Sequence, residues 1–416
     1  MPKHTKDFKG MPGFDQANDW MFTGLEELTR KAARYMLQVA LEAEVDEFVS
    51  QNSAIRTPDG KQAVVRNGYN KTRDFLVGSG VLDVSVPRTR NRIGGENFRS
   101  TIIPPYMRRS LKMEEAIPML YLYGISETDM MPALRSIFGE TVKGLSPGSI
   151  ARMREAWHKE RKEWCQRKLD GKRFCYVWVD GIYFNAQSRE NKLCTLVMIG
   201  VNEQGEKEVI AVEEGLRESS ETWGAILRML KDRGFQAPKL FIGDGSLGFW
   251  KASREVFPEA ASQRCWVHKT RNILDNIHKT LHGKAKEALA LIYTAPNRAT
   301  AKSAIAAFGR QFGAKYPKAQ ECLEKDIDAL LTFFDFPAEH WIHIRSTNAI
   351  ESTFSTVRLR TNKMKGCGSS ETIMTMVYKL LEKASGRWRK LRGHGLVAAV
   401  LNGQVFKDGV AEDQAA

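Results

Sequence analysis

The chain has 416 residues, of which 42% are hydrophobic and 27% charged, so it is long enough to bury at least one large core. Lys and Arg total 63 against 49 Asp and Glu, a formal net charge of +14. This balance favours a polyanionic partner, nucleic acid first, and argues against an ordinary small-metabolite enzyme. No apolar stretch is long enough for a membrane span, and no apolar segment follows the basic N-terminus, which predicts a cytoplasmic protein without a signal peptide.

The six cysteines are sparse for this length, and no two of them have Cys-x-x-Cys spacing. Neither a disulfide scaffold nor a four-cysteine zinc module is indicated, so we interpret them as reduced thiols. No nucleotide cofactor is expected.

The chain begins with a polar arm, residues 1–20, that is expected to be flexible. Apolar residues then recur at three- and four-residue steps from Phe22 to Val49, which predicts an amphipathic helix. The dipeptide Asn67-Gly68 predicts a hairpin turn, and the alternation from Leu82 to Val86 predicts a half-buried strand. Residues 21–112 are therefore interpreted as a helix and a small β unit that contacts a DNA end.

Helical periodicity returns after this β unit. Helices are predicted at 113–123, 127–138 and 149–165, with glycines in the turns between them. Their short connections suit a helix-turn-helix, so residues 113–170 are interpreted as a DNA-binding region. The third helix would present basic side chains to DNA, namely Arg152, Arg154, His158 and Lys159. A basic amphipathic helix can equally be a solvated one.

From Arg173 onward the pattern is that of a buried sheet with helices. Strands are predicted at 174–179, 194–201, 209–212, 239–243 and 262–266, and helices at 221–233 and 249–256. Three antiparallel strands followed by alternating helices and strands are the order of a ribonuclease H-like sheet. The predicted class is thus α+β and multidomain, with a ribonuclease H-like mixed sheet core and N-terminal helical and β DNA-binding elements.

The rest of the chain is predicted to be helical. Residues 171–267 would form the first part of the core, and residues 268–345, rich in Ala and Lys, an all-helical insertion. Residues 346–395 would supply a core helix and a basic C-terminal helix, followed by a tail at 396–416. Between Arg358 and Arg392, ten Lys or Arg stand against two Glu, which favours contact with a DNA backbone, although such runs are commonly solvated surface.

Two aspartates follow predicted core strands directly. Asp180 comes after the first strand and Asp244 after the fourth, where α/β sheets place their ligands. These strands are neighbours in such a sheet, so the two carboxylates would lie close together. Taken singly, each Asp-Gly pair could equally mark a turn at a strand end. Glu351, on a helix opened by Ser346-Thr347-Asn348, offers a third carboxylate, or else a first-turn glutamate favoured by the helix dipole.

Three converging carboxylates repel one another unless cations separate them. Hard oxygen ligands select Mg²⁺ or Mn²⁺. A two-ion site of this kind activates water or a 3′-hydroxyl for in-line displacement at a phosphodiester.

Four segments carry a family resemblance. The run DGSLGFWKASREVFPEAASQRCWVHKTRN, from Asp244 to Asn272, resembles the signature segment of Mutator-type bacterial insertion-sequence transposases. The segment that carries this family's catalytic glutamate is similar to STNAIESTFSTVRLRTN. The context of its first aspartate is similar to VWVDGIYF, and its N-terminal strand motif is similar to RNGYNKTRDFLVGSGVLDVSVPRTR.

The resemblance implies a DNA transposase with a DDE triad of Asp180, Asp244 and Glu351, which would hold two Mg²⁺ ions, with Mn²⁺ as the alternative. It further implies binding of double-stranded DNA, both terminal inverted repeats and target, and a replicative copy-out route. Because two ends must be synapsed, a homodimer on DNA is expected. The rival hypotheses are a transposase-derived, non-catalytic DNA-binding protein and a structure-specific ribonuclease H-like nuclease.

Further residues in and around these segments allow alternative interpretations. Cys265 and His268 could form half of a zinc site, but no second pair has suitable spacing, so a structural or DNA-positioning role without zinc is predicted. Trp341 would be a core residue or stack on an unpaired base. Phosphate contact is predicted for basic residues, namely Arg88, Arg90, Arg152, Arg154, Arg264, Lys269, Arg271, Arg358, Arg360, Lys363 and Lys365.

Overall fold

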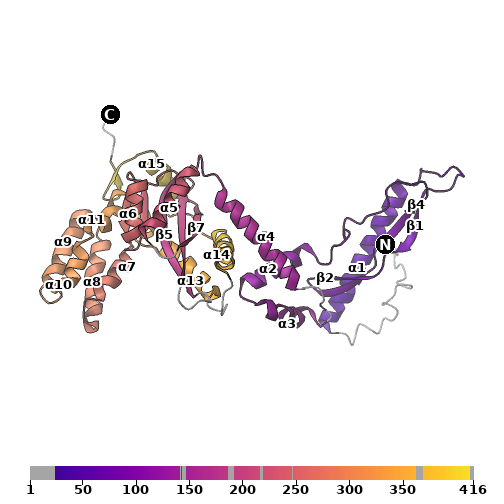
Figure 1. The fold of residues 1–416 in the computed structure, drawn as a ribbon, viewed down its shortest axis with the longest axis horizontal. Helices are drawn as coiled ribbons and strands as arrows, with labels where there is room; N and C mark the ends of the chain where they lie inside the picture. Colours follow the sequence, from indigo (N-terminus) through magenta and orange to yellow (C-terminus); the bar gives the residue numbers. More distant parts are fainter. Residues whose placement is uncertain are drawn as a thin grey trace, which may run out of the picture. The chain divides into compact units, whose positions relative to one another are not determined.

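The computed structural model describes residues 24–140, 142, 147–185, 192–215, 219–245, 247–361 and 369–412, drawn as a ribbon in Figure 1. The chain divides into two compact units, Met1–Ala151 and Arg152–Ala416. The predicted α+β class is confirmed, because a five-stranded mixed sheet and many helices are present. The predicted arm, residues 1–20, lies outside the described residues, and the finer division into seven parts stays a prediction.

The first unit contains a long helix and two small sheets. Its elements are α1 (Leu25–Gln51), β1 (Val64–Tyr69), β2 (Arg73–Val77), β3 (Gly80–Val84) and β4 (Pro87–Asn91). Strand β1 pairs with β4 and β2 with β3, both antiparallel. Leu41 of α1 packs with Phe75, Leu82 and Val84 in a small core. The predicted helix is therefore confirmed, since its apolar stripe covers the β unit.

The predicted hairpin turn at Asn67-Gly68 is wrong. Both residues lie inside β1, and Gly68 has a φ of 67°, which glycine adopts without strain. The pairing of β1 with β4 shifts register between Arg66 and Tyr69, so the dipeptide accommodates an irregularity within a strand. The hairpin of this unit instead joins β2 to β3, whose pairing begins at Val77 and Gly80.

The three predicted helices are confirmed as α2 (Leu111–Leu122), α3 (Glu127–Phe138) and α4 (Pro147–Gln166). Most of α4 belongs to the second unit, where it packs on α14 (Ser370–Ser385). The rings of Trp164 and Tyr378 lie 5.0 Å apart, and Lys379 Nζ lies 2.6 Å from Glu160 Oε1. This helix is thus anchored to the core by an aromatic pair and an ion pair.

The second unit is built on one mixed sheet. Its strands are β5 (Phe174–Asn185), β6 (Lys192–Asn202), β7 (Lys207–Gly215), β8 (Leu240–Gly243) and β9 (Ala261–Arg264). Their order across the sheet is β7-β6-β5-β8-β9. Strands β5 to β7 are antiparallel, whereas β8 runs parallel to both β5 and β9. The first and fourth strands are therefore neighbours, as the sequence predicted.

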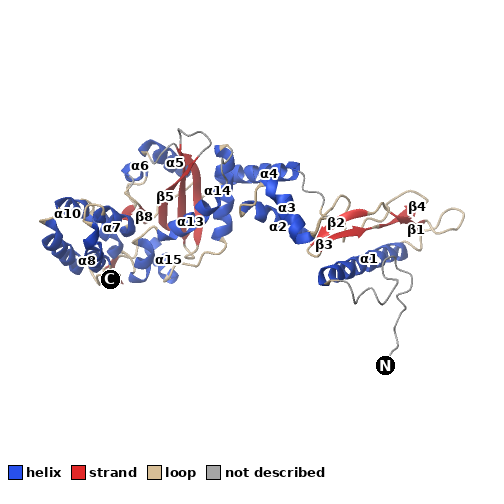
Figure 2. Ribbon diagram, turned by 90° about the horizontal axis from the view of Figure 1, so that it is seen from below, coloured by secondary structure: helices blue, strands red, loops and turns tan. Residues whose placement is uncertain are grey.

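Helices cover both faces of this sheet (Figure 2). On one face, Val177 and Val179 belong to a core with Trp223 of α5 (Ser220–Asp232) and Phe249 of α6 (Leu247–Val256). On the other face, the Tyr176 hydroxyl lies 2.6 Å from His340 Nδ1, and α13 (Asn348–Thr361) packs on β5. Alternation along β5 separates these two sets of neighbours.

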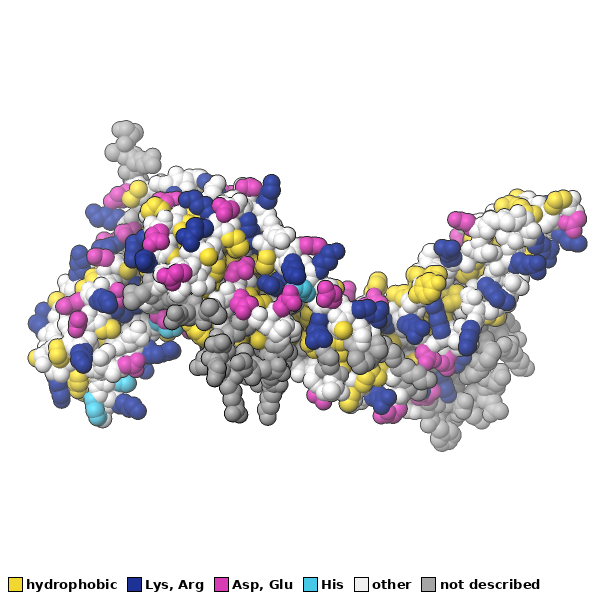
Figure 3. Space-filling model, viewed as in Figure 1, with side chains coloured by type: hydrophobic (Ala, Val, Ile, Leu, Met, Phe, Trp, Pro, Cys, Tyr) yellow, Lys and Arg dark blue, Asp and Glu magenta, His cyan; other side chains and the backbone are white. Residues whose placement is uncertain are grey.

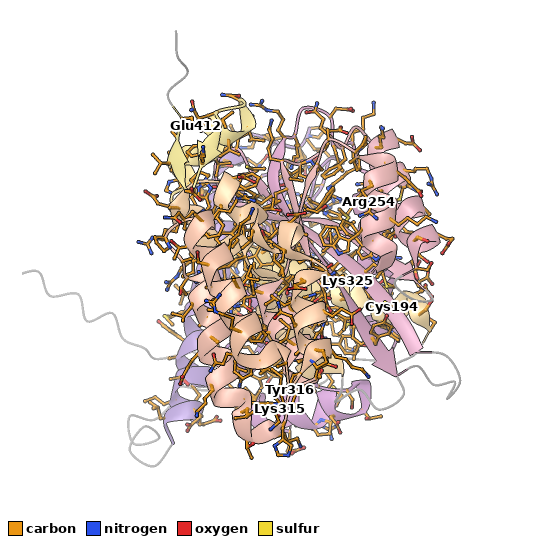
Figure 4. The ribbon with its side chains drawn as sticks, turned by 90° about the vertical axis from the view of Figure 1, so that its left-hand side faces the viewer. Cys194, Arg254, Lys315, Tyr316, Lys325 and Glu412 are labelled. Atoms are coloured by element: carbon orange, nitrogen blue, oxygen red, sulfur yellow. The ribbon has the colours of Figure 1, made fainter. Side chains whose placement is uncertain are left out.

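Residues 268–345 form helices joined by turns, with no strand among them, and all of them are described. The α-helices are α7 (Trp266–Leu274), α8 (His282–Tyr293), α9 (Arg298–Phe308), α10 (Pro317–Glu324), α11 (Ile327–Leu331) and α12 (Trp341–Ile344). Figure 4 looks onto these helices, with Lys315 and Tyr316 at one end of the group. The buried Gln263 amide donates to the Leu330 carbonyl at 3.1 Å, which fastens the insertion to β9.

The segment predicted as a tail is folded as far as it is described. It contains α15 (Val397–Leu401) and a hairpin of β10 (Phe406–Lys407) and β11 (Val410–Ala411). Helix α15 contacts β5, so this segment belongs to the core unit. Among the described residues, no helix combines the length and apolar character that a bilayer crossing requires.

Candidate active site

The parallel pairing of β5 with β8 ends at Val179 and Gly243. The next residue of each segment is an aspartate, so Asp180 and Asp244 follow the last paired residues of strands that lie about 4.8 Å apart. One expectation needs correction: Asp180 does not end its strand. Strand β5 continues to Asn185 because its antiparallel pairing with β6 extends beyond the shorter β8.

Local hydrogen bonds hold both aspartates. The Gly181 amide donates to Asp180 Oδ1 at 2.8 Å, and the Gly245 amide donates to Asp244 Oδ1. The indole N–H of Trp250 donates to the Asp244 carbonyl at 2.8 Å. A side chain on Gly243 would approach Val179 within 2.9 Å, so glycine there lets the two strand ends lie close together.

Glu351 lies in the first turn of α13. Ile350, Phe354 and Val357 of this helix are fully buried, which confirms the predicted inward stripe. The Thr347 hydroxyl donates to Glu351 Oε1 at 2.5 Å. The glutamate is thus held at the N-terminal end of a helix that packs on β5.

Trp178 ties the segment before this helix to the strand that carries Asp180. Its indole N–H donates to the carbonyls of His343 and Ser346, at 3.2 and 3.1 Å, which ties the segment before α13 to β5. Residues two apart in a strand share a face, so Asp180 lies on the face of β5 that this segment covers.

His268 of α7 connects the other two carboxylates. Its Nε2 lies 3.9 Å from Asp244 Oδ2, and its Nδ1 lies 3.6 Å from Glu351 Oε1. A hydrogen bond to the Cys265 sulfur, aided by the charges of Cys265, Asp244 and Glu351, outweighs burial and raises the pKa of His268 to about 9. The imidazole is therefore protonated at neutral pH between two acids.

Cys265 is buried at the N-terminal end of α7, and the amide and hydroxyl of Thr347 lie 3.3 and 3.2 Å from its sulfur. Burial raises the pKa of this thiol, but hydrogen bonds from His268 and Thr347 outweigh it and leave the pKa below its ordinary value. Ligand atoms of Cys265, His268 and Glu351 all lie within 4.8 Å of one another. The Cys265-x-x-His268 motif thus adjoins the carboxylates of Asp244 and Glu351, a proximity that the spacing of the motif did not reveal.

Two of the basic residues predicted to touch phosphate are engaged inside the protein. Lys269 is only 3% exposed and pairs with Asp326, and Arg264 Nη1 lies 3.3 Å from the same carboxylate. These ion pairs disfavour the predicted DNA contact of Lys269 and Arg264, since a buried pair would have to break to free either cation. Asp326 lies in no motif, so the sequence offered no way to find it, whereas Thr347 lies within the STNAIESTF segment, which gave no sign of its contact with Glu351.

The other basic residues are distributed over both units. Arg88 and Arg90 are exposed on β4, and Arg88 Nε donates to the Asn67 carbonyl at 2.6 Å. Figure 3 shows Lys and Arg side chains on the visible face of the first unit. Exposed residues of the second unit include Arg152, Arg271 and Arg358, whereas Arg154 is half-buried. Lys363, Lys365 and the side chain of Arg360 lie outside the described part of the chain.

His158 and Trp341, two residues predicted as possible DNA contacts, pack inside the second unit. His158 is not a DNA-facing residue of α4, because it is 12% exposed and its Nδ1 lies 3.3 Å from Thr375 Oγ1. Trp341 packs against Phe333 and Phe334, with ring centroids 5.3 and 4.9 Å away, and donates to the Phe336 carbonyl. These contacts favour the core interpretation of Trp341.

Known proteins similar to this chain are transposases, and the similarity extends over most of its length. Residues 12–391 match the family model "Transposase, Mutator family". The transposase for insertion sequence element IS6120 of Mycolicibacterium smegmatis is 48% identical over 297 residues, 71% of this chain and 92% of that protein. The transposase for IST2 of Acidithiobacillus ferrooxidans is 46% identical over 283 residues, 68% of this chain and 95% of that protein.

A more distant relative extends the match. The transposase for IS256 in transposon Tn4001 of Staphylococcus aureus is 27% identical over 342 residues, 80% of this chain and 84% of that protein. The family model covers both compact units and every candidate carboxylate. This chain therefore belongs to the Mutator family of transposases, the transposases of insertion sequence elements.

Proposed function

We propose that the chain cuts the ends of its insertion sequence and joins them to another DNA site, with Asp180, Asp244 and Glu351 as catalytic carboxylates. The observation that supports this proposal is the placement of the three acids in the second unit. Asp180 and Asp244 follow paired residues of adjacent parallel strands, and His268 contacts both Asp244 and Glu351. A binding module has no evident use for such mutually repelling acids.

We further assign the sheet to the ribonuclease H-like class. The strand order β7-β6-β5-β8-β9, with three antiparallel strands and two parallel ones, supports the assignment, as does the helical segment between the second aspartate and the glutamate. In this scheme α13 closes the core after the insertion and returns Glu351 to the sheet.

The donor set suits divalent magnesium, with manganese as the alternative, because it consists of carboxylate oxygens at a partly exposed strand end. Two ions held there by Asp180, Asp244 and Glu351 would activate water or a 3′-hydroxyl and stabilise the leaving oxygen. The chain's own part is to orient these carboxylates. The Gly181 and Gly245 amides do so for the aspartates and Thr347 for the glutamate.

Cys265 and His268 would position these ligands without holding zinc. His268 bridges the two carboxylates that come from different elements, and Cys265 joins α7 to the loop before α13 through Thr347. We expect His268→Ala to weaken strand transfer and Cys265→Ser to leave the metal content unchanged. One tightly held zinc per chain in elemental analysis, lost in either variant, would instead make the pair metal ligands.

DNA recognition would fall mainly to the N-terminal elements. Residues 21–112 and 113–170, with Arg88, Arg90 and Arg152, would bind the terminal inverted repeats, supported by the net charge of +14 and the exposure of these side chains. A homodimer would synapse two ends, and the family suggests a replicative copy-out route.

The test is incubation of the purified full chain with the ends of its own element, target DNA and Mg²⁺, with products resolved on sequencing gels. Nicks at the element ends and joined product are expected. Cleavage without joining would indicate a nuclease of the same fold, and binding without cleavage would indicate a non-catalytic DNA-binding protein.

A further inference from the structure

A pocket of about 580 Å³ lies between α7, α8, α12 and the start of α13. Its volume is within the range of small-molecule and nucleotide sites. The walls include two apolar side chains that water reaches, Val267 at 39% and Ile342 at 55% exposed, together with the half-buried Tyr293. The pocket therefore offers an apolar and aromatic surface in an otherwise strongly charged insertion.

Cations surround that surface. Arg271, Lys286 and Arg345 line the pocket against a single acid, Asp275. The guanidinium carbon of Arg345 lies 5.4 Å from the centroid of the Tyr293 ring, and its Nη1 donates to the Tyr293 carbonyl at 2.8 Å. A guanidinium and an aromatic ring can stack on a flat base, and the further cations can bind a phosphate. The pocket therefore suits a nucleotide.

The pocket adjoins the candidate active site. Ser346 and Asn348 line it, and they flank Thr347, whose hydroxyl donates to Glu351. Helix α7 supplies Val267 and Arg271 to the pocket and His268 to the carboxylates. A DNA strand with a phosphate at the carboxylates therefore has its neighbouring nucleotide within reach of the pocket.

We propose that this pocket receives a nucleobase turned out of the duplex beside the scissile phosphate. The inference rests on the proposed function, because the DNA must lie at Asp180, Asp244 and Glu351. Contact of the base with Tyr293, Val267 and Ile342 offsets part of the loss of stacking in the duplex, and the cations bind the flanking phosphates. Opening of the end would expose the cleavage point to the carboxylates.

The direct test is photocrosslinking with the full chain. Duplexes of the element's own end carry a single 5-iodouracil at each position within about three base pairs of the cleavage point, the scale of one flipped base and its neighbours. We expect one position next to the cleaved phosphate to crosslink to peptides containing Tyr293 or residues 267–271, as mapped by mass spectrometry. Crosslinks that all map outside the pocket overturn the proposal.

A matched pair of variants tests the consequence. Ile342→Glu places an anion in the pocket, whereas Leu291→Glu makes the same change at a side chain of α8 that is 65% exposed and does not line the pocket. We expect Ile342→Glu to lower the cleavage rate about tenfold and Leu291→Glu to leave it unchanged. Because both positions are exposed, neither variant should lose its fold.

An abasic site at the crosslinking position separates base capture from a general electrostatic effect. Without a base to bind, Ile342→Glu and the parent should cleave at nearly equal rates, as in a double-mutant cycle. A tenfold deficit that persists on the abasic duplex, or equal losses in both variants, overturns the inference. If the parent cleaves no end at all, the proposed function fails with it, whereas cleavage that Ile342→Glu leaves unchanged removes the pocket inference alone.

Discussion

The candidate site of the second unit and strand β4 of the first unit hold their charged side chains in different ways. Around the candidate site of the second unit, charged groups are fixed by one another: His268 lies between Asp244 and Glu351, and Lys269 pairs with Asp326. On β4 of the first unit, Arg88 and Arg90 are exposed. The difference fits the proposed roles of the two regions, because catalytic groups require a rigid framework whereas groups that neutralise phosphate require reach and solvent access.

The largest effect is expected from the carboxylates. Asp180→Asn, Asp244→Asn or Glu351→Gln removes a charge that would hold a divalent ion and hardly changes volume, so cleavage and joining should fall by at least about a thousandfold. Binding of end DNA should persist or strengthen slightly, which a gel shift measures. Asp232→Asn, at an exposed helix end, is the control and should remain active. Near-parental cleavage by Glu351→Gln would require another third ligand.

The proposal that the first unit binds the DNA ends and the second unit performs the chemistry is tested by a fragment that begins at residue 152. This boundary keeps the part of α4 from Arg152 onward, including Trp164 and Glu160, which pack on α14. The fragment should stay folded by circular dichroism but lose specific end binding. For the full chain, about six phosphate contacts imply roughly a thousandfold loss of affinity between 50 and 200 mM salt. A flat salt response, or a fragment that binds like the full chain, contradicts the assignment.

The buried ion pair of the second unit should matter for stability. Lys269→Ala leaves Asp326 with one cationic partner fewer in a site where only 3% of the lysine is exposed, so the free energy of unfolding should fall by about 3–5 kcal/mol. The exposed Arg271→Ala should change it by less than about 0.5 kcal/mol. Denaturant titrations compare the two. Equal stabilities would mean that the pair with Asp326 contributes nothing.

Replacing the exposed arginines of β4 should affect DNA binding and not stability, the opposite of the result expected for Lys269. Arg88→Ala combined with Arg90→Ala should leave stability nearly unchanged but reduce the slope of log affinity against log salt by about 1.8, or about 0.9 for each lost phosphate contact. Lys61→Ala, at an exposed lysine that pairs with Asp59, is the control. A slope that the double variant leaves intact would remove β4 from the DNA-binding surface.

The smallest effect concerns acid stability in the second unit. Burial, and then the nearby charges of Lys207, His340 and Arg392, lowers the pKa of His343 to about 4. The unfolded imidazole takes up a proton near pH 6.5, so this group favours unfolding as pH falls from about 6.5 to 4. His343→Gln should make the decline in melting temperature between pH 7 and 5 shallower. An unchanged decline would exclude His343 as a contributor.

Much of the framework was predictable from local pattern. The apolar run Phe174–Val179 and the stripe of Ile350 and Phe354 report burial, and the glycines on both sides of Asp244 report the end of a strand, features that depend on near neighbours. The same logic failed at Asn67-Gly68, because a glycine with positive φ serves a strand irregularity as well as a turn.

Most of the helices and the core strands could be predicted from the sequence, and the three acids could be proposed from it, since periodicity and residue type carry that information. How the charged side chains are used depends on tertiary packing. Lys269 and Arg271 stand two residues apart in one motif, yet Lys269 is buried against Asp326 while Arg271 is exposed at a pocket. Asp326 lies in a helical segment far along the chain, and an ion pair between distant segments depends on packing that no local pattern encodes.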